Sequence, residues 1–168
     1  MKTIKKQEDI VESIKDILLK DSLTLAIAES VTCGHLQAAF AAIKDTGKFF
    51  QGGITVYNLG QKARHLKVEP IGAERENCVC REVAETMALN VTEMFSSTVG
   101  VSITGYASLI PEMGIKDLFA FCAVSVKGKI VVTEKLTTEK ENIIEVQNDY
   151  CEQVLNKLLH ALKKRSYK

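Results

Sequence analysis

Polar residues that could do chemistry follow an apolar segment near the start of the chain. The apolar residues 23–28 are followed by Glu29, Ser30 and Thr32, and an alanine-rich pattern typical of a helix begins shortly afterwards. Where a strand passes into a helix, side chains meet free backbone N–H groups and the positive end of the helix dipole. A serine hydroxyl in that place could act as a nucleophile if a base lay within reach.

Lys62 is the candidate base for that serine. The sequence offers no obvious Ser-His-Asp set, because His35, His65 and His160 fall in segments with helical patterns. A lysine that is desolvated, and therefore neutral, can take the proton of a serine hydroxyl. Lys62 follows a predicted strand that ends at Tyr57, and it could reach back toward the edge of the sheet.

A third predicted strand brings another hydroxyl to the same side, because Thr104 and Gly105 close an apolar segment. A purely structural interpretation is equally available from the residues. In that interpretation Ser30 or Thr32 caps a helix, Lys62 is a solvated helix residue and Thr104 belongs to a turn. Residue types and spacing alone leave both interpretations open.

Hydrophobic periodicity predicts the elements that would position these residues. Predicted helices span residues 7–20, 36–43, 59–68 and 139–164, with another that starts near Cys80, and predicted strands span 23–28, 52–57, 97–104, 118–126 and 129–136. We expect Ile143 on the buried side of the last helix. This order predicts one α/β domain over residues 1–168, a three-layer α/β/α sandwich with a mixed β-sheet.

Composition narrows the classes of function. The 168 residues are 46% hydrophobic and 26% charged, as in an average globular domain, and the net charge of +1 offers no general attraction for nucleic acid. We expect no membrane-spanning segment and no signal peptide, and hence a cytoplasmic protein. The five scattered cysteines predict reduced thiols rather than a disulfide framework. No metal or cofactor is predicted, since the histidines and carboxylates lack the spacing of metal ligands.

Four segments together resemble a known family. The segments AESVTCG (28–34), GGITVYNLGQK (52–62), CVCREVAETMA (78–88) and VSITGYA (101–107) are similar to motifs of the CinA C-terminal domain family of competence/damage-inducible proteins. The resemblance extends over roughly residues 8–162, in one order and almost without gaps. Active members of the family are nicotinamide-nucleotide amidases, which convert nicotinamide mononucleotide and water to nicotinic acid mononucleotide and ammonia.

The resemblance implies a compact α/β/α fold and roles for individual residues. Ser30 would be the nucleophile and Lys62 the general base, while Tyr57 would assist proton transfer or orient the lysine. Backbone N–H groups near Cys33 and Gly34 would form an oxyanion hole. The implied substrate-binding residues all lie in or beside the motifs: Glu29, Thr32, Cys33, Gly34, Thr104, Gly105 and Lys140. Glu29 could instead be purely structural. The resemblance also implies a small-molecule substrate and a homo-oligomer that the first helix could help to form.

The sequence departs from the family pattern where a nucleotide would bind. Cys33 replaces a glycine, and the glycine-rich loop after Gly105 becomes a segment with three bulky residues, Tyr106, Leu109 and Ile110. Of two arginines expected before the last helix, one is replaced by Lys140 and the other by Ile144. A phosphate would therefore meet a poorer binding site than in active relatives.

Two hypotheses follow from these matches and departures. One is a working amidohydrolase, on an altered substrate without a phosphate, which predicts a hydrogen bond of about 2.6–3.2 Å between Ser30 and Lys62 and a lowered pKa for the lysine. The other is a catalytically silent binding or oligomerisation domain, which predicts that Tyr106 or Leu109 fills the pocket. A nucleic-acid module is not supported, because no basic stripe with interleaved aromatic residues is present.

Overall fold

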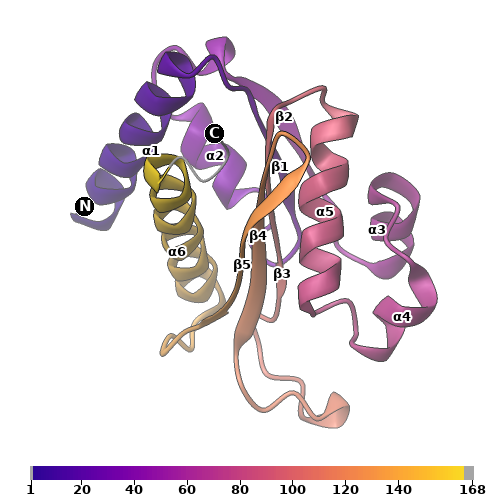
Figure 1. Cartoon of the computed structure of the whole chain (residues 1–168). Coiled ribbons are helices and arrows are strands. Elements are labelled where there is room, and N and C mark those ends of the chain that lie inside the picture. Colours follow the sequence, from indigo (N-terminus) through magenta and orange to yellow (C-terminus); the bar gives the residue numbers. More distant parts are fainter. Residues whose placement is uncertain (1, 165–168) are drawn as a thin grey trace.

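The computed structural model describes residues 2–164, with side chains from residue 7 onward (Figure 1). A five-stranded sheet, in the order β2-β1-β3-β4-β5, is surrounded by helices. The elements are α1 (Lys2–Lys20), β1 (Leu25–Glu29), α2 (His35–Ala41), β2 (Phe50–Thr55), α3 (Leu59–Leu66), α4 (Pro70–Arg75), α5 (Arg81–Met94), β3 (Val99–Gly105), β4 (Phe119–Val126), β5 (Lys129–Thr137) and α6 (Ile143–Lys164), with short 3₁₀ turns at Thr46–Lys48 and Pro111–Met113.

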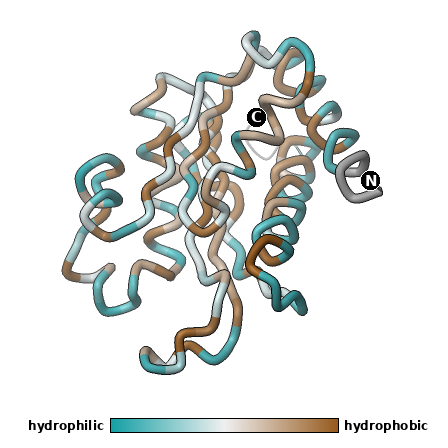
Figure 2. Tube along the Cα trace, turned by 180° about the vertical axis from the view of Figure 1, so that it is seen from behind, coloured by the Kyte–Doolittle hydropathy of each residue, from teal (hydrophilic) through white to brown (hydrophobic). Residues whose placement is uncertain are grey.

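The sheet is mixed and lies between two helical layers. β1 pairs in parallel with β2 and β3, whereas β4 pairs antiparallel with β3 and with β5. Helices α1, α2 and α6 cover one face of the sheet, and α3, α4 and α5 cover the other (Figure 1). Along α1 and α6 hydrophilic and hydrophobic bands alternate, which is the pattern of helices with one buried side (Figure 2). The predicted α/β/α sandwich is therefore confirmed.

The sheet supplies the core, because β1 is buried along its whole length and β3 along all but its last residue. On α6 the predicted buried side is correct from Val146 and Tyr150 onward, but wrong at Ile143, which is 49% exposed. Ile143 is the first residue of the helix and lies at a cavity rather than over the sheet.

The helix predicted over 59–68 is α3, which ends at Leu66, and a second short helix that was not predicted, α4, begins at Pro70. Lys67 adopts a left-handed backbone conformation with φ of 55°, which ends α3. Pro70 then occupies the first turn of α4, where its missing N–H costs nothing, and Glu69 caps this helix by accepting from Ile71 N and Gly72 N. Pro70 thus marks the beginning of a second helix as well as a limit to the first one.

A buried carboxylate shapes the turn between β1 and α2. Glu29, at the end of β1, is 0% exposed. Its carboxylate accepts hydrogen bonds from the backbone N–H groups of Gly34 (3.0 Å), Leu36 (3.2 Å) and Gln37 (2.9 Å), and from the side chains of Thr32 (2.6 Å) and Gln37 (3.1 Å). The side chain therefore satisfies the N–H groups that the start of α2 would leave unpaired.

We expect Glu29→Ala to lower the free energy of unfolding by about 3 kcal/mol or more, because it leaves several buried donors unpaired. Glu69→Ala is the matched control, since it removes an exposed carboxylate cap and should cost only about 1 kcal/mol. Urea denaturation of the two variants at neutral pH measures both values. Equal losses would contradict the importance of the Glu29 network.

Gly100 in β3 should tolerate no side chain. A Cβ there would overlap the Ala88 carbonyl oxygen and lie 2.6 Å from Thr92 Cγ2 and 2.7 Å from Ser125 Oγ. We expect Gly100→Ala to destabilise the fold by about 2–3 kcal/mol, as overpacked cores do. Gly47→Ala, whose added Cβ meets nothing within 4 Å, should change stability by less than about 0.5 kcal/mol in the same thermal denaturation assay.

Candidate active site

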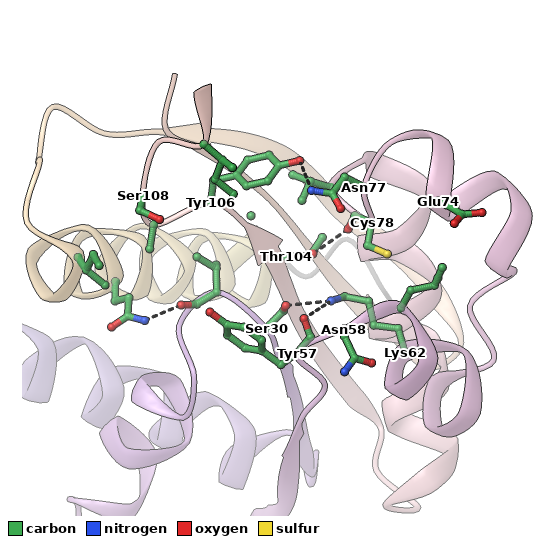
Figure 3. A pocket seen from close by; sticks show the side chains of 18 residues that line it. Ser30, Tyr57, Asn58, Lys62, Glu74, Asn77, Cys78, Thr104, Tyr106 and Ser108 are labelled. Carbon is green, nitrogen blue, oxygen red and sulfur yellow. Dashed lines mark hydrogen bonds between the residues drawn. The ribbon is translucent and has the colours of Figure 1, made fainter. Parts of the chain in front are cut away.

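Ser30 and Lys62 meet at one edge of the sheet (Figure 3). Lys62 Nζ and Ser30 Oγ lie 2.9 Å apart within hydrogen-bonding geometry, and the two residues are 2% and 5% exposed. Ser30 directly follows β1, and Lys62 lies in the first turn of α3. The hydrogen bond expected between them is therefore present.

Backbone carbonyl groups hold the amine of Lys62 in place. Its Nζ also donates to the carbonyl oxygens of Val56 (3.0 Å) and Tyr57 (3.5 Å). All three acceptors are uncharged oxygen atoms, so these contacts offset only part of the cost of burying an ammonium group. Burial accordingly lowers the pKa of Lys62, and the nearby Cys78 thiol opposes this shift to a smaller extent.

The local sequence explains why Lys62 points inward. Asn58 caps α3, because its Oδ1 accepts from the backbone N–H of Gln61 at 3.0 Å. Lys62 and Leu66 are four residues apart and therefore share one face of the helix, and both are buried. Leu66 packs in a hydrophobic cluster with Ala28 of β1, which presses this face of α3 against the sheet and delivers the lysine to Ser30.

A cavity of about 520 Å³ opens beside the pair. Its walls come from the end of β1, the β2–α3 connection, the α4–α5 segment, the end of β3 and the start of α6. Ser30, Tyr57, Lys62, Thr104 and Gly105 all line it. The structure thus brings together one hydroxyl, one amine and several neutral polar groups in a space that can admit a small molecule.

Tyr106 forms a wall of the cavity and does not fill it. Its hydroxyl accepts a hydrogen bond from Asn77 Nδ2 (3.1 Å), and its ring packs edge-to-face on Phe119 with centroids 5.4 Å apart. The hydroxyl of Tyr150 donates a hydrogen bond to the backbone carbonyl oxygen of Tyr106 at 3.2 Å. Leu109 is 53% exposed and does not belong to the lining. The expectation that Tyr106 or Leu109 occupies the pocket is therefore wrong.

The predicted oxyanion hole at Cys33 and Gly34 is also wrong. The Cys33 N–H donates to the carbonyl oxygen of Ser30 (3.2 Å), and the Gly34 N–H donates to Glu29 (3.0 Å), so both groups are already paired. Cys33 has a left-handed backbone with φ of 49° and an exposed side chain, and neither residue lines the cavity. The turn therefore directs the Cys33 N–H toward the Ser30 carbonyl oxygen and the Gly34 N–H toward the Glu29 carboxylate.

Three further predicted binding residues lie outside the cavity lining. Glu29 and Thr32 are bonded to each other in the turn, which favours the structural interpretation of Glu29. Lys140 is exposed in the segment before α6. Tyr57, in contrast, lines the cavity with its side chain 70% exposed, and its backbone carbonyl rather than its phenol contacts Lys62.

Thr104 has a structural contact in addition to its place in the lining. Its hydroxyl donates to the carbonyl oxygen of Cys78 at 2.8 Å, which ties the segment before α5 to the end of β3. Cys78, which is buried, also lines the cavity, and all five cysteines are free thiols. Thr104 therefore holds two parts of the cavity wall together.

Several cavity residues escaped the sequence analysis. Asn77 lies between α4 and α5, Glu74 lies on α4, and Gln147 lies in the second turn of α6. Gln147 donates to the carbonyl oxygen of Val31 at 2.8 Å and so supports the residue next to the serine. The helical period places Gln147 beside Ile143, but only the packing of α6 shows that this end of the helix reaches the site.

Over residues 2–164, no helix combines the length and the apolar character that crossing a membrane requires. Within the same part of the chain, histidine, cysteine, aspartate and glutamate side chains form no group of three or more that could hold a metal ion.

Known proteins resemble the chain in sequence and in structure. Protein YdeJ of Escherichia coli is 35% identical over 107 residues, which cover 64% of this chain and 61% of that protein. A putative competence-damage inducible protein of Listeria monocytogenes (serotype 4a) is 33% identical over 117 residues, 70% of this chain but only 28% of that protein. The chain thus spans less than a third of the length of that relative.

A solved structure agrees over nearly the whole chain. The crystal structure of a competence or damage-inducible protein from Enterobacter asburiae superposes with a TM-score of 0.87 at 25% identity, covering 93% of this chain and 98% of that one. The model of the CinA C-terminal domain family matches residues 7–162. The chain therefore belongs to the CinA C-terminal domain family.

Proposed function

We propose that the protein is a CinA-like amidohydrolase in which Ser30 is the nucleophile and Lys62 the general base. The observation that carries this proposal is the 2.9 Å contact between two buried side chains at the wall of an open cavity. The family resemblance suggests nicotinamide mononucleotide, or a related small amide, as the substrate.

In the proposed reaction Ser30 Oγ attacks the carbonyl carbon of the amide as neutral Lys62 takes the hydroxyl proton. The C–N bond then breaks, and the lysine returns the proton to the nitrogen, which leaves as ammonia. Water next attacks the acyl-serine ester with Lys62 again as base, and the acid product leaves as Ser30 regains its proton. The lowered pKa of Lys62 supports this role because a base must hold an unprotonated amine.

We expect Ser30→Ala and Lys62→Met each to reduce ammonia release by about 10²–10⁴-fold, because each removes one member of the reacting pair. The substrates are nicotinamide mononucleotide and its dephosphorylated form, nicotinamide riboside. Lys44→Met, which alters an exposed lysine away from the cavity lining, is the matched control and should keep wild-type rates. Circular dichroism checks that each variant is folded.

Covalent labelling gives a second readout that does not depend on the choice of amide. A serine-directed β-lactone should add once to the wild-type protein at Ser30, as seen by intact mass and peptide mapping, and should not add to Ser30→Ala. Labelling should also slow strongly in Lys62→Met. A folded wild-type protein that releases no ammonia and resists the probe would refute the proposed mechanism.

The rate should rise with pH as Lys62 loses its proton, and it should level off below the ordinary lysine pKa of 10.5, because burial lowers the pKa of this group. Between the lowered pKa and 10.5 the unfolded chain binds a proton that the folded protein does not, so stability should also rise with pH in that window. In Lys62→Met the free energy of unfolding should rise less steeply with pH in this window, because the titrating amine is gone. Urea denaturation as a function of pH, for both proteins, measures it.

A further inference from the structure

We propose, on the basis of the function above, that the substrate is a flat aromatic carboxamide that carries no phosphate group. The cavity offers the surroundings for an uncharged or positively charged ring and lacks those for a phosphate. This inference narrows the substrate class within the proposed amide hydrolysis and concerns the part of the cavity beyond the Ser30–Lys62 pair.

The charges around the cavity oppose a phosphate. Among the described residues that line it, Lys62 is the one basic side chain and Glu74 the one acidic side chain. Lys62 is 2% exposed, bonds Ser30, and has a pKa lowered by burial, so it is a poor counterion for a phosphate. Proteins hold phosphates with arginine, lysine or free backbone N–H groups, and the side chains of the first two kinds are missing from the rest of this lining.

The helix N-termini near the cavity offer little compensation, although such ends often bind anions. At α3, Asn58 accepts from Gln61 N at 3.0 Å, and at α6, Asn142 accepts from Ile144 N at 3.0 Å. At α2, the carboxylate of Glu29 already takes three backbone N–H groups and adds a negative charge. At these three helix N-termini, side chains of the protein itself therefore occupy some of the donors that a phosphate would use.

What the cavity does offer suits an aromatic ring. The side chain of Tyr57 lies beside Ser30 at the opening, and Tyr106 forms another part of the wall (Figure 3). Ile110 and Ile143 add apolar surface from the β3–β4 loop and from the start of α6. Aromatic faces attract flat rings and cations, and the carboxylate of Glu74 also favours positive charge.

A matched pair of ligands tests the inference. Nicotinamide riboside and nicotinamide mononucleotide share the pyridinium ring, the carboxamide and the ribose, and differ by one phosphate. Isothermal titration with Ser30→Ala, which cannot form the acyl-serine, should show at least about tenfold tighter binding of the riboside. Equal affinities, tighter binding of the mononucleotide, or no binding of the riboside would overturn the inference.

A charge substitution provides an independent readout. Ile143→Arg in the Ser30→Ala background places a cation in the lining at a half-exposed position, and should shift the ratio of affinities toward the mononucleotide by about tenfold. Met94→Arg, on an exposed residue at the far end of α5 and outside the lining, is the matched control and should leave the ratio unchanged. An unchanged ratio in Ile143→Arg, or an equal shift in the control, would count against the inference.

The binding test separates this inference from the proposed function. Preferred binding of the riboside without ammonia release from either ligand by the wild-type protein would support the inference and refute the hydrolysis. Ammonia release together with a preference for the mononucleotide would do the reverse.

Discussion

The carboxylate of Glu29 is buried at the end of β1. It accepts hydrogen bonds from the Thr32 hydroxyl in the following turn and from the backbone N–H groups of Gly34, Leu36 and Gln37 at the start of α2. A buried carboxylate is costly unless its oxygens are well supplied with donors, and here the donors are those that the start of α2 would otherwise leave unpaired. The N–H groups satisfy the carboxylate oxygens, and the carboxylate satisfies the N–H groups. The position of Ser30 depends on this network, because the serine is the residue between the strand and the turn.

The second constraint is the burial of Lys62. A buried ammonium group that contacts three neutral oxygens is unfavourable, and the group therefore loses its proton more readily. The same burial that penalises the charged form favours the neutral amine, which is the form that the proposed base requires. Packing of α3 through Leu66 holds the helix against the sheet, with Lys62 beside Ser30. Stability and reactivity are thus connected through a single side chain.

The departures from the family pattern leave the reacting pair intact and alter its surroundings. Tyr106 stands in the loop where glycines are typical of the family, yet its ring is anchored by Asn77 and Phe119 and leaves the cavity open. Membership of the CinA C-terminal domain family rests on a match over residues 7–162 and on shared architecture. Neither finding identifies a substrate, so the chemistry of the cavity wall becomes the best guide to it.

The sequence by itself was sufficient for the layer architecture and for the order of helices and strands apart from α4, and its family motifs predicted the pairing of Ser30 with Lys62. Hydrophobic periodicity is a local signal that predicts helices and strands. The family motifs predicted the contact between Ser30 and Lys62, which are far apart in the sequence. The sequence did not show that the N–H groups of Cys33 and Gly34 are paired, because their partners, the Ser30 carbonyl oxygen and the Glu29 carboxylate, are set by the folded turn. It also failed at Ile143, since helical period marks a face but not where the sheet beneath that face ends. Only the tertiary structure decided that Tyr106 lines an open cavity, because the direction of a side chain in a loop follows from the neighbours packed against it.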